Sequence, residues 1–212
     1  MKKIELQENE VLVFQGDSVT DCGCSKEDDS YLGNGYVGLI AARLLFCYPE
    51  LNLRIYNKGY SGNRIYDMEA RFDKDCIDLK PTTITILIGI NDTWRRFDSN
   101  LISKPSEYYA SYRRILDKSL EKSKAKLVLM DPFLLPDPPD RKAWREDLEE
   151  RINIVRNLAK EYQAVYIPLD SLFYQASINT SYNYWCLDGV HPTLAGHSLI
   201  ANAWLQNIVI KS

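Results

Sequence analysis

The sequence predicts an α/β protein, a three-layer α/β/α sandwich built around a five-stranded parallel sheet. Five short apolar runs are typical of buried strands, at 11–15, 53–57, 83–88, 126–130 and 164–167. Amphipathic stretches long enough for helices separate the runs. A helical crossover between two strands makes them parallel and places the helix on a face of the sheet. No linker or shift in composition divides residues 1–212, so we expect a single domain.

The helices are expected at 36–46, 63–77, 106–122, 141–162 and 193–209, with a short one near Ser171. In the second of these, Ile65, Met68 and Phe72 recur at helical spacing and form an apolar face. Pro105 stands where the third helix begins, a position that tolerates the missing N–H of proline. Four prolines exclude regular structure from 131–140.

The composition is that of an ordinary globular protein, with 45% hydrophobic and 26% charged residues. The net charge of -3 gives no electrostatic reason to expect nucleic acid or an anionic membrane as a partner. No apolar run approaches the length of a membrane span. Glu5, Glu8 and Glu10 stand where a signal peptide requires apolar residues, so we expect a cytoplasmic protein. The sequence leaves open whether identical chains assemble into an oligomer.

The five cysteines, at positions 22, 24, 47, 76 and 186, contain no CxxC pair. Their odd number and the expected cytoplasmic setting favour ordinary reduced thiols over a disulfide framework. With only two histidines in the chain, we expect no metal site and no cofactor.

The segment GDSVT, residues 16–20, directly follows the first predicted strand. Gly16 allows a tight turn there, and Ser18 comes just past the strand end. In an open α/β sheet this edge is where ligands bind. A serine in that position is a nucleophile when a base reaches it, and otherwise it belongs to an ordinary polar turn.

Three later loops bring complementary groups to the same edge. Gly62 follows the second strand, in NKGYSGN, and Asn91 follows the third, in GIND. Asp188 and His191 share the loop DGVHP before the last helix. Each loop alone is consistent with turn chemistry, but together they supply what acyl transfer from an ester needs. Ser18 attacks, His191 accepts its proton and returns it to the leaving alcohol, and Asp188 orients the imidazole.

A tetrahedral oxyanion also needs hydrogen-bond donors. The backbone N–H groups of Ser18 and Gly62 and the side-chain amide of Asn91 are the expected three. The spacing of Asp188 and His191 lets the base and its orienting carboxylate lie on one short loop.

These four blocks resemble the SGNH, or GDSL, hydrolase superfamily, and they occur here in that superfamily's order. The resemblance runs from residue 11 to nearly the end of the chain. It implies a flavodoxin-like sandwich, a Ser-His-Asp triad, no metal, and esterase or acylhydrolase activity. The neighbouring residues are most similar to the intracellular acetylxylan esterases, in GDSVTDCG, LGNGYVG, CYPEL, NKGYSGN, IGINDTWRRFD and DGVHPTLAGH. The departure is Gly189, where that branch is expected to carry a larger residue.

Two tryptophans stand beside motif residues, Trp94 after Asn91 and Trp185 before Asp188. Their flat apolar faces suit a sugar ring or an apolar acyl group, and core packing is the equal alternative. We assign Trp94 and Trp185, together with Asp17, to substrate binding. The expected partner is therefore a small acetylated sugar.

The segment GNGYVG, residues 33–38, fits the dinucleotide pattern GxGxxG and opens a helix. That fingerprint must follow a strand directly, but here the polar loop 21–33 intervenes. Close packing of the helix start under the Ser18 loop is the favoured interpretation. The second histidine, His197, falls within the last predicted helix and is expected to be structural.

The favoured function is a serine esterase that removes O-acetyl groups from carbohydrate, in particular xylo-oligosaccharides, through an acyl-enzyme intermediate. A thioesterase or lysophospholipase would use the same triad, but it needs a long apolar groove, which the polar mouth near Arg95 and Arg96 disfavours. A non-catalytic binding module on the same sandwich is the third alternative. The intact set of Ser18, Asp188 and His191 argues against it.

Overall fold

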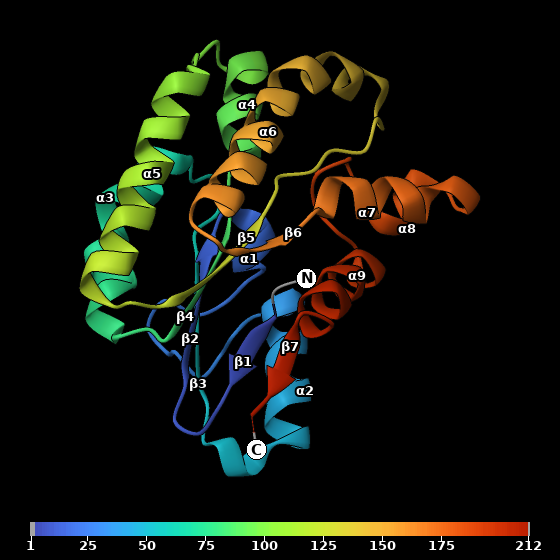
Figure 1. Ribbon diagram of the computed structural model, residues 1–212. Coiled ribbons are helices and arrows are strands. Elements are labelled where there is room, and N and C mark those ends of the chain that lie inside the picture. The colour runs from blue at the N-terminus through green and yellow to red at the C-terminus, as the bar shows by residue number, and fades with distance from the viewer. Residues whose placement is uncertain (1–2, 212) are drawn as a thin grey trace.

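The computed structural model describes residues 3–211, and a parallel five-stranded sheet of order β3-β2-β4-β5-β6 runs through its centre (Figure 1). The strands of this sheet are β2 (Val11–Gly16), β3 (Arg54–Gly59), β4 (Thr83–Leu87), β5 (Lys126–Met130) and β6 (Val165–Ile167). The strand that comes first along the chain lies between the second and the third, which is the flavodoxin-like order. The predicted fold class is therefore confirmed.

Helices cover both faces of the sheet. They are α1 (Ser18–Asp21), α2 (Tyr36–Cys47), α3 (Ile65–Asp75), α4 (Ile90–Asp98), α5 (Pro105–Lys122), α6 (Arg145–Glu161), α7 (Leu169–Ala176), α8 (Tyr182–Trp185) and α9 (Leu194–Leu205). Short 3-10 turns occupy Pro49–Leu51, Ile77–Leu79, Pro139–Trp144 and Ser177–Asn179. Helices α3, α5 and α6 pack on one face, and α2 and α9 pack on the other (Figure 1).

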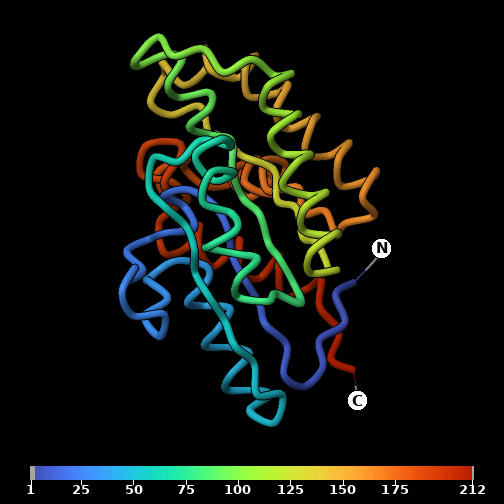
Figure 2. The backbone as a smooth tube through the Cα atoms, turned by 90° about the vertical axis from the view of Figure 1, so that its left-hand side faces the viewer, coloured from blue at the N-terminus to red at the C-terminus, as the bar shows by residue number. Residues whose placement is uncertain are grey.

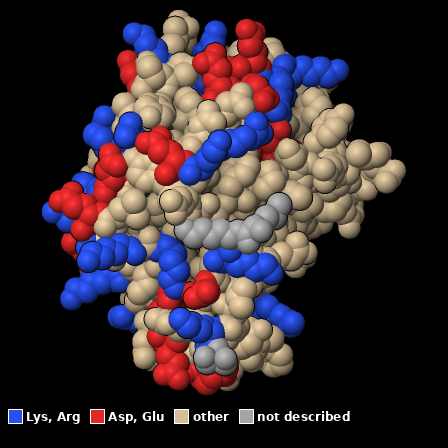
Figure 3. All heavy atoms as spheres, viewed as in Figure 1, with Lys and Arg blue, Asp and Glu red and all other residues tan. Residues whose placement is uncertain are grey.

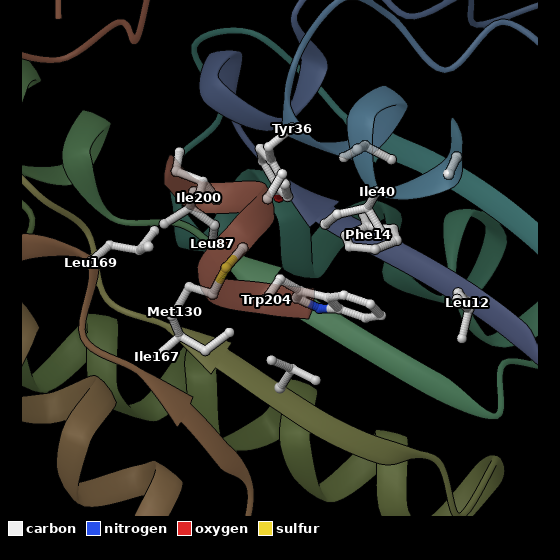
Figure 4. Packing of buried hydrophobic residues seen from close by; sticks show 14 of the residues in the cluster. Leu12, Phe14, Tyr36, Ile40, Leu87, Met130, Ile167, Leu169, Ile200 and Trp204 are labelled. Carbon is white, nitrogen blue, oxygen red and sulfur yellow. The ribbon is translucent and has the colours of Figure 1, made fainter. Parts of the chain in front are cut away.

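The alternation of side chains along each strand divides the core into two apolar clusters. In β2, Val11 and Val13 face α3 and α5, whereas Leu12 and Phe14 face α2 and α9. Trp204 of α9 lies against Phe14 with ring centroids 5.5 Å apart (Figure 4). Its indole Nε1 donates a hydrogen bond to Thr85 Oγ1 at 3.0 Å, so the largest side chain in this cluster is also satisfied as a donor.

The structure differs from the sequence prediction at its two ends. Strands β1 (Ile4–Leu6) and β7 (Ile208–Ile210) pair in parallel as a second sheet, with Ile4 opposite Ile208. Figure 2 shows the blue and red ends of the tube running side by side. The helix predicted over 193–209 therefore ends at Leu205. A strand of three residues is too short to show a period of two, and its partner lies at the far end of the chain, so the local pattern could not reveal it.

A second difference follows β4. The segment holding Asn91 was predicted as a loop, but it begins helix α4 directly after Gly89, whose φ of 131° makes the turn. Ile90, Trp94 and Phe97 in fact have helical spacing. The helix predicted from residue 141 begins at Arg145, because the 3-10 turn Pro139–Trp144 precedes it.

Charged side chains of both signs mix over the helices on the face seen in Figure 3, whereas the region of α7 and α8 carries few charges there. Within residues 3–211, no helix combines the length and the apolar character needed to cross a bilayer. All five cysteines are free thiols, as the sequence predicts.

Candidate active site

Ser18 lies at the carboxyl edge of the sheet, where β2 ends. Asp17 caps helix α1, and its carboxylate accepts a hydrogen bond from the Val19 backbone N–H at 3.1 Å. Gly16 has no room for a side chain, since a Cβ there would lie 2.4 Å from the Leu87 carbonyl oxygen. The GDS sequence thus makes a tight strand-to-helix turn that leaves the Ser18 side chain half-buried at the helix start.

The loop between α8 and α9 folds around the Asp188 carboxylate. Asp188 Oδ1 accepts the backbone N–H groups of Val190 at 3.0 Å and His191 at 2.7 Å. Gly189 allows this turn with a φ of 83°. The His191 carbonyl accepts from the Leu187 N–H at 2.9 Å, which closes the loop. The Asp-x-x-His spacing therefore builds a rigid turn that carries both side chains.

Three side chains form one hydrogen-bonded chain. Ser18 Oγ lies 2.9 Å from His191 Nε2, and His191 Nδ1 lies 2.8 Å from Asp188 Oδ2. A carboxylate only accepts, so Nδ1 carries the ring proton, and the neutral Nε2 is left to accept from the Ser18 hydroxyl. This is the arrangement that activates a serine as a nucleophile.

The electrostatics of the pair suit this tautomer. The hydrogen bond to the Asp188 carboxylate raises the pKa of His191 above 6.5, although partial burial opposes the rise. Burial would raise the pKa of Asp188, but the side-chain and backbone hydrogen bonds from His191 hold it well below its usual range. Asp188 therefore stays ionised beside a histidine that readily takes up a proton.

The other two predicted oxyanion donors are Gly62, in the loop after β3, and Asn91, in helix α4 after β4. Gly62 has a φ of 82°, which a side chain would strain. Asn91, only 3% exposed, lies in the first turn of α4, and its Nδ2 donates to the Asn63 carbonyl at 3.1 Å. That bond uses one amide hydrogen and leaves the second for another acceptor. Asp21 of α1 ties the Gly62 loop to the Ser18 helix through the Ser61 N–H, at 3.0 Å.

A buried polar cluster that the sequence analysis did not predict supports the Asn91 and Gly62 loops. Asp92 accepts from the Ile65 N–H at 3.1 Å and from Ser103 Oγ at 2.9 Å, so it links the starts of α3 and α4. Arg151, which has no exposed surface, donates to the Ser103 carbonyl at 2.7 Å and pairs with Asp147 at 2.7 Å. The sequence signal that could have revealed this cluster is Arg151, an arginine on the apolar face of the helix predicted over 141–162.

The structure brings Trp94 to the reacting groups. Its ring centroid lies 5.8 Å from that of His191 and 5.2 Å from that of Trp144. The Arg141 guanidinium lies over both indoles, at 4.9 and 4.0 Å, and its Nε donates to the Asp188 carbonyl at 3.2 Å. Arg141 and Trp144 were not predicted as site residues, because they were assigned to the helix expected over 141–162, whereas both lie in the 3-10 turn Pro139–Trp144.

The other two residues predicted to bind substrate are Trp185 and Asp17. Trp185 packs against Tyr184, with ring centroids 5.0 Å apart, and lines a groove formed by α7, α8 and α9. Asp17 is 1% exposed, and burial raises its pKa to about 7. The structure shows Asp17 as the cap of α1, and the predicted contact with substrate stays a prediction.

The segment 33–38 is packed as the sequence analysis favoured. A Cβ on Gly35 would lie 2.7 Å from Cys22 Cβ, and one on Gly38 would lie 2.4 Å from the Gly33 carbonyl. His197 is buried in α9, where its Nδ1 accepts from the Tyr36 N–H at 3.2 Å and caps the start of α2. The glycines therefore serve close packing next to the Ser18 helix.

Comparison with known proteins gives a consistent result. The sequence profile of the GDSL-like lipase/acylhydrolase family matches residues 14–199. An acetylxylan esterase from Geobacillus stearothermophilus is 32% identical over 212 residues, which covers 97% of this chain and 96% of that protein.

Solved structures agree with the sequence match. A structure described as a GDSL-like lipase from Parabacteroides merdae superposes with a TM-score of 0.91 at 34% identity, covering 97% of this chain and 98% of the other. The Geobacillus acetylxylan esterase gives a TM-score of 0.85 at 32% identity, covering 95% of each chain. Catalytic mutants of that esterase, in which a serine, an aspartate or a histidine is replaced by alanine, match with a TM-score of 0.87.

Proposed function

The chain belongs to the GDSL-like lipase/acylhydrolase family, and from that premise we propose that it is a serine esterase which removes O-acetyl groups from carbohydrate. The family and the acetylxylan esterase relative identify it as a carboxylic ester hydrolase. The observation that carries the finer proposal is the hydrogen-bonded chain from Ser18 through His191 to Asp188 at the carboxyl edge of the sheet.

In the first half of the proposed reaction, Ser18 Oγ bonds to the acetyl carbonyl carbon while its proton passes to His191 Nε2. The bond between that carbon and the sugar oxygen then breaks, and the sugar oxygen takes the proton from Nε2. In the second half, water attacks the acetyl-serine and gives a proton to Nε2. Acetate leaves, and Ser18 Oγ recovers its proton.

Negative charge develops on the carbonyl oxygen in both halves of the reaction. The N–H groups of Ser18 and Gly62 and the free amide hydrogen of Asn91 are the proposed donors to it. Asn91 is nearly fully buried, so its hydrogen bond to the oxyanion would form away from bulk water. Donors held in place in this way stabilise the transition state more than the ground state.

The space beside Ser18 supports a short acyl group. Asp17 and Val19, its two neighbours, line a hollow of about 10 Å³ together with Ile90, Phe133 and Val190. A hollow of that size holds roughly one water-sized group. So small a space leaves no room for a long acyl chain, which would overpack it.

Two observations support a carbohydrate alcohol. Trp94 lies next to His191 and is half-buried, so a sugar ring bound at the ester can stack on it. The Geobacillus relative is called an acetyl-xylooligosaccharide esterase, and by analogy we propose acetylated xylo-oligosaccharides as substrates.

The test is a comparison of p-nitrophenyl acetate, butyrate and octanoate, followed by acetylated xylo-oligosaccharides with the loss of each acetyl group read by mass spectrometry. Ser106→Ala, an exposed serine at the start of α5, is the matched control for Ser18→Ala. We expect activity to fall steeply from acetate to butyrate and to be negligible on octanoate. A preference for octanoate or for an acyl thioester would contradict the carbohydrate esterase and favour the thioesterase or lysophospholipase alternative.

A further inference from the structure

A second hollow lies along the same edge of the sheet as the triad. It has a volume of about 580 Å³, and its lining includes Leu134 and Arg141 from the segment after β5, Arg145 at the start of α6, and Asp170 and Tyr174 of α7. In the strand order β3-β2-β4-β5-β6, Ser18 follows β2, whereas this hollow lies beyond β5 and β6. The carboxyl ends of parallel strands share one edge, so the hollow continues the triad edge to one side.

Arg141 lies between the hollow and the loop that carries Asp188 and His191. It lines the hollow, and its Nε donates to the backbone carbonyl of Asp188 at 3.2 Å. The same guanidinium stacks on Trp94, which contacts His191. A ligand that contacts Arg141 in the hollow is therefore separated from Asp188 by the Arg141 side chain alone.

The hollow offers one unpaired positive charge. Three cations line it, Arg141, Lys142 and Arg145, but Arg141 pairs with Asp140 at 2.8 Å and Arg145 pairs with Glu149 at 2.6 Å. Arg145 neutralises Asp170 through hydrogen bonds of 2.7 and 2.8 Å. Lys142 is exposed and has no ion pair with any residue in 3–211, so its charge is free for a ligand.

The lining also has apolar surface that suits a sugar ring. Tyr174, the aromatic residue of this lining, is 63% exposed, and Leu134 and Pro136 add apolar surface. An exposed aromatic ring beside fixed cations presents a flat face for a pyranose together with charge for an acidic substituent.

We propose that this hollow is an accessory subsite for a uronic acid unit of the oligosaccharide, whose carboxylate pairs with Lys142 and whose ring stacks on Tyr174. The inference rests on the proposed carbohydrate function. It deepens that function by assigning the enzyme a preference for acidic, branched acetylated oligosaccharides over neutral ones.

The test measures binding, so that it does not depend on hydrolysis. The intact protein is titrated by calorimetry with a deacetylated xylo-oligosaccharide that bears a glucuronic acid branch, with the neutral oligosaccharide of equal length, and with free glucuronate. We expect the acidic oligosaccharide to bind about two- to fivefold more tightly than the neutral one, as one partly exposed ion pair allows. The difference should shrink at high salt.

Lys142→Glu should abolish or reverse this discrimination. Lys160→Glu is the matched control, since Lys160 is an exposed residue near the other end of α6, roughly 22 Å along the helix from Arg145. It should leave the ratio of affinities unchanged. Tyr174→Ala should weaken the binding of the acidic oligosaccharide.

Equal affinity for the two oligosaccharides, or the same loss of discrimination in both lysine variants, would overturn the proposal. If free glucuronate bound as tightly as the acidic oligosaccharide, the hollow would be a general anion site, and this result would also overturn the proposal. The proposed function is tested by a different measurement. It would be contradicted if p-nitrophenyl acetate were hydrolysed but neither acetylated oligosaccharide were deacetylated. The binding data still decide on the subsite in that case.

Discussion

Ser18 Oγ and His191 Nε2 lie 2.9 Å apart, although 173 positions separate the two residues in the chain. The contact joins the first loop of the sheet edge to the last, and Asp188 extends it through the His191 ring. One hydrogen-bonded unit therefore depends on two segments that are held in place by different parts of the fold.

Because these side chains act as a unit, their removal should not be additive. Ser18→Ala and His191→Ala should each lower kcat on p-nitrophenyl acetate by several orders of magnitude. The double variant should be little worse than either single one. Steady-state kinetics and labelling with a fluorophosphonate measure this. A Ser18→Ala protein with near-normal activity would remove the proposed mechanism.

Asn91→Ala should cost about 10²–10³ in kcat with a smaller change in KM, since the lost donor serves mainly the transition state. Asn202→Ala, which replaces an exposed asparagine on α9, controls for general effects of the substitution. If Asn91→Ala changed KM alone, Asn91 would be a substrate-binding residue instead.

The activity should have an acidic limb governed by His191. A general base must be neutral, and the Asp188 hydrogen bond raises the pKa of His191, so kcat/KM should fall as the pH drops through a value above 6.5. Asp188→Asn removes that cause, so it should move the limb to lower pH and reduce kcat by about 10⁴. A limb that stays in place in Asp188→Asn would assign the titration to another group.

Gly189→Ala tests the turn that carries Asp188 and His191. A Cβ at this position would lie 2.5 Å from the Leu135 carbonyl and 2.6 Å from the Asp137 carbonyl, and the φ of 83° is strained for alanine. We expect a loss of about 1–3 kcal/mol in the free energy of unfolding and a lower kcat. Gly23→Ala is the control, because Gly23 has a similar φ of 77° but open space around its Cβ. Equal losses in the two variants would show that strain alone acts.

His197 should make the fold sensitive to acid. Burial lowers its pKa to about 4, whereas the unfolded chain takes up this proton near 6.5. The contribution of neutral His197 is thus complete above pH 6.5 and is lost as the pH falls toward 4, on the order of 3 kcal/mol. Urea unfolding of the protein and of His197→Gln at pH 7 and 4.5 isolates the effect, since Asp17 and Asp92 titrate in both. A difference between the two proteins that does not change with pH would contradict this account.

The strands of the main sheet could be predicted because each is a short run rich in apolar and β-branched residues, as 83–87 shows, and the helices between them because their apolar residues recur at helical spacing. Ser18 and Asn91 could be placed at one edge because parallel topology puts every strand's carboxyl end there, whereas Asp188 and His191 follow no strand and were placed there by the chemistry they complete. The predictions for the strands, the helices, Ser18 and Asn91 needed only local patterns and connectivity.

Other features depend on packing between segments that are distant in sequence, and no local pattern reports them. Trp94 and Trp185 have equivalent positions beside the motifs, yet only Trp94 turns toward His191, while Trp185 packs on α8 and α9. Arg141 reaches Asp188 from the 3-10 turn Pro139–Trp144, which was predicted as the start of a helix. The sequence marks Asp17 as part of a motif, but only its hydrogen bond from the Val19 N–H shows that it is a cap.

The pairing of β1 with β7 has a consequence for how the protein is made. Ile4 and Leu6 are buried in the finished fold, and their strand partners Ile208 and Ile210 are synthesised about 200 residues after them. At about 5–20 residues per second, the first strand waits on the order of 10–40 s for its partner. A nascent chain truncated before β7 would thus display an unpaired apolar strand edge, the kind of surface that chaperones bind.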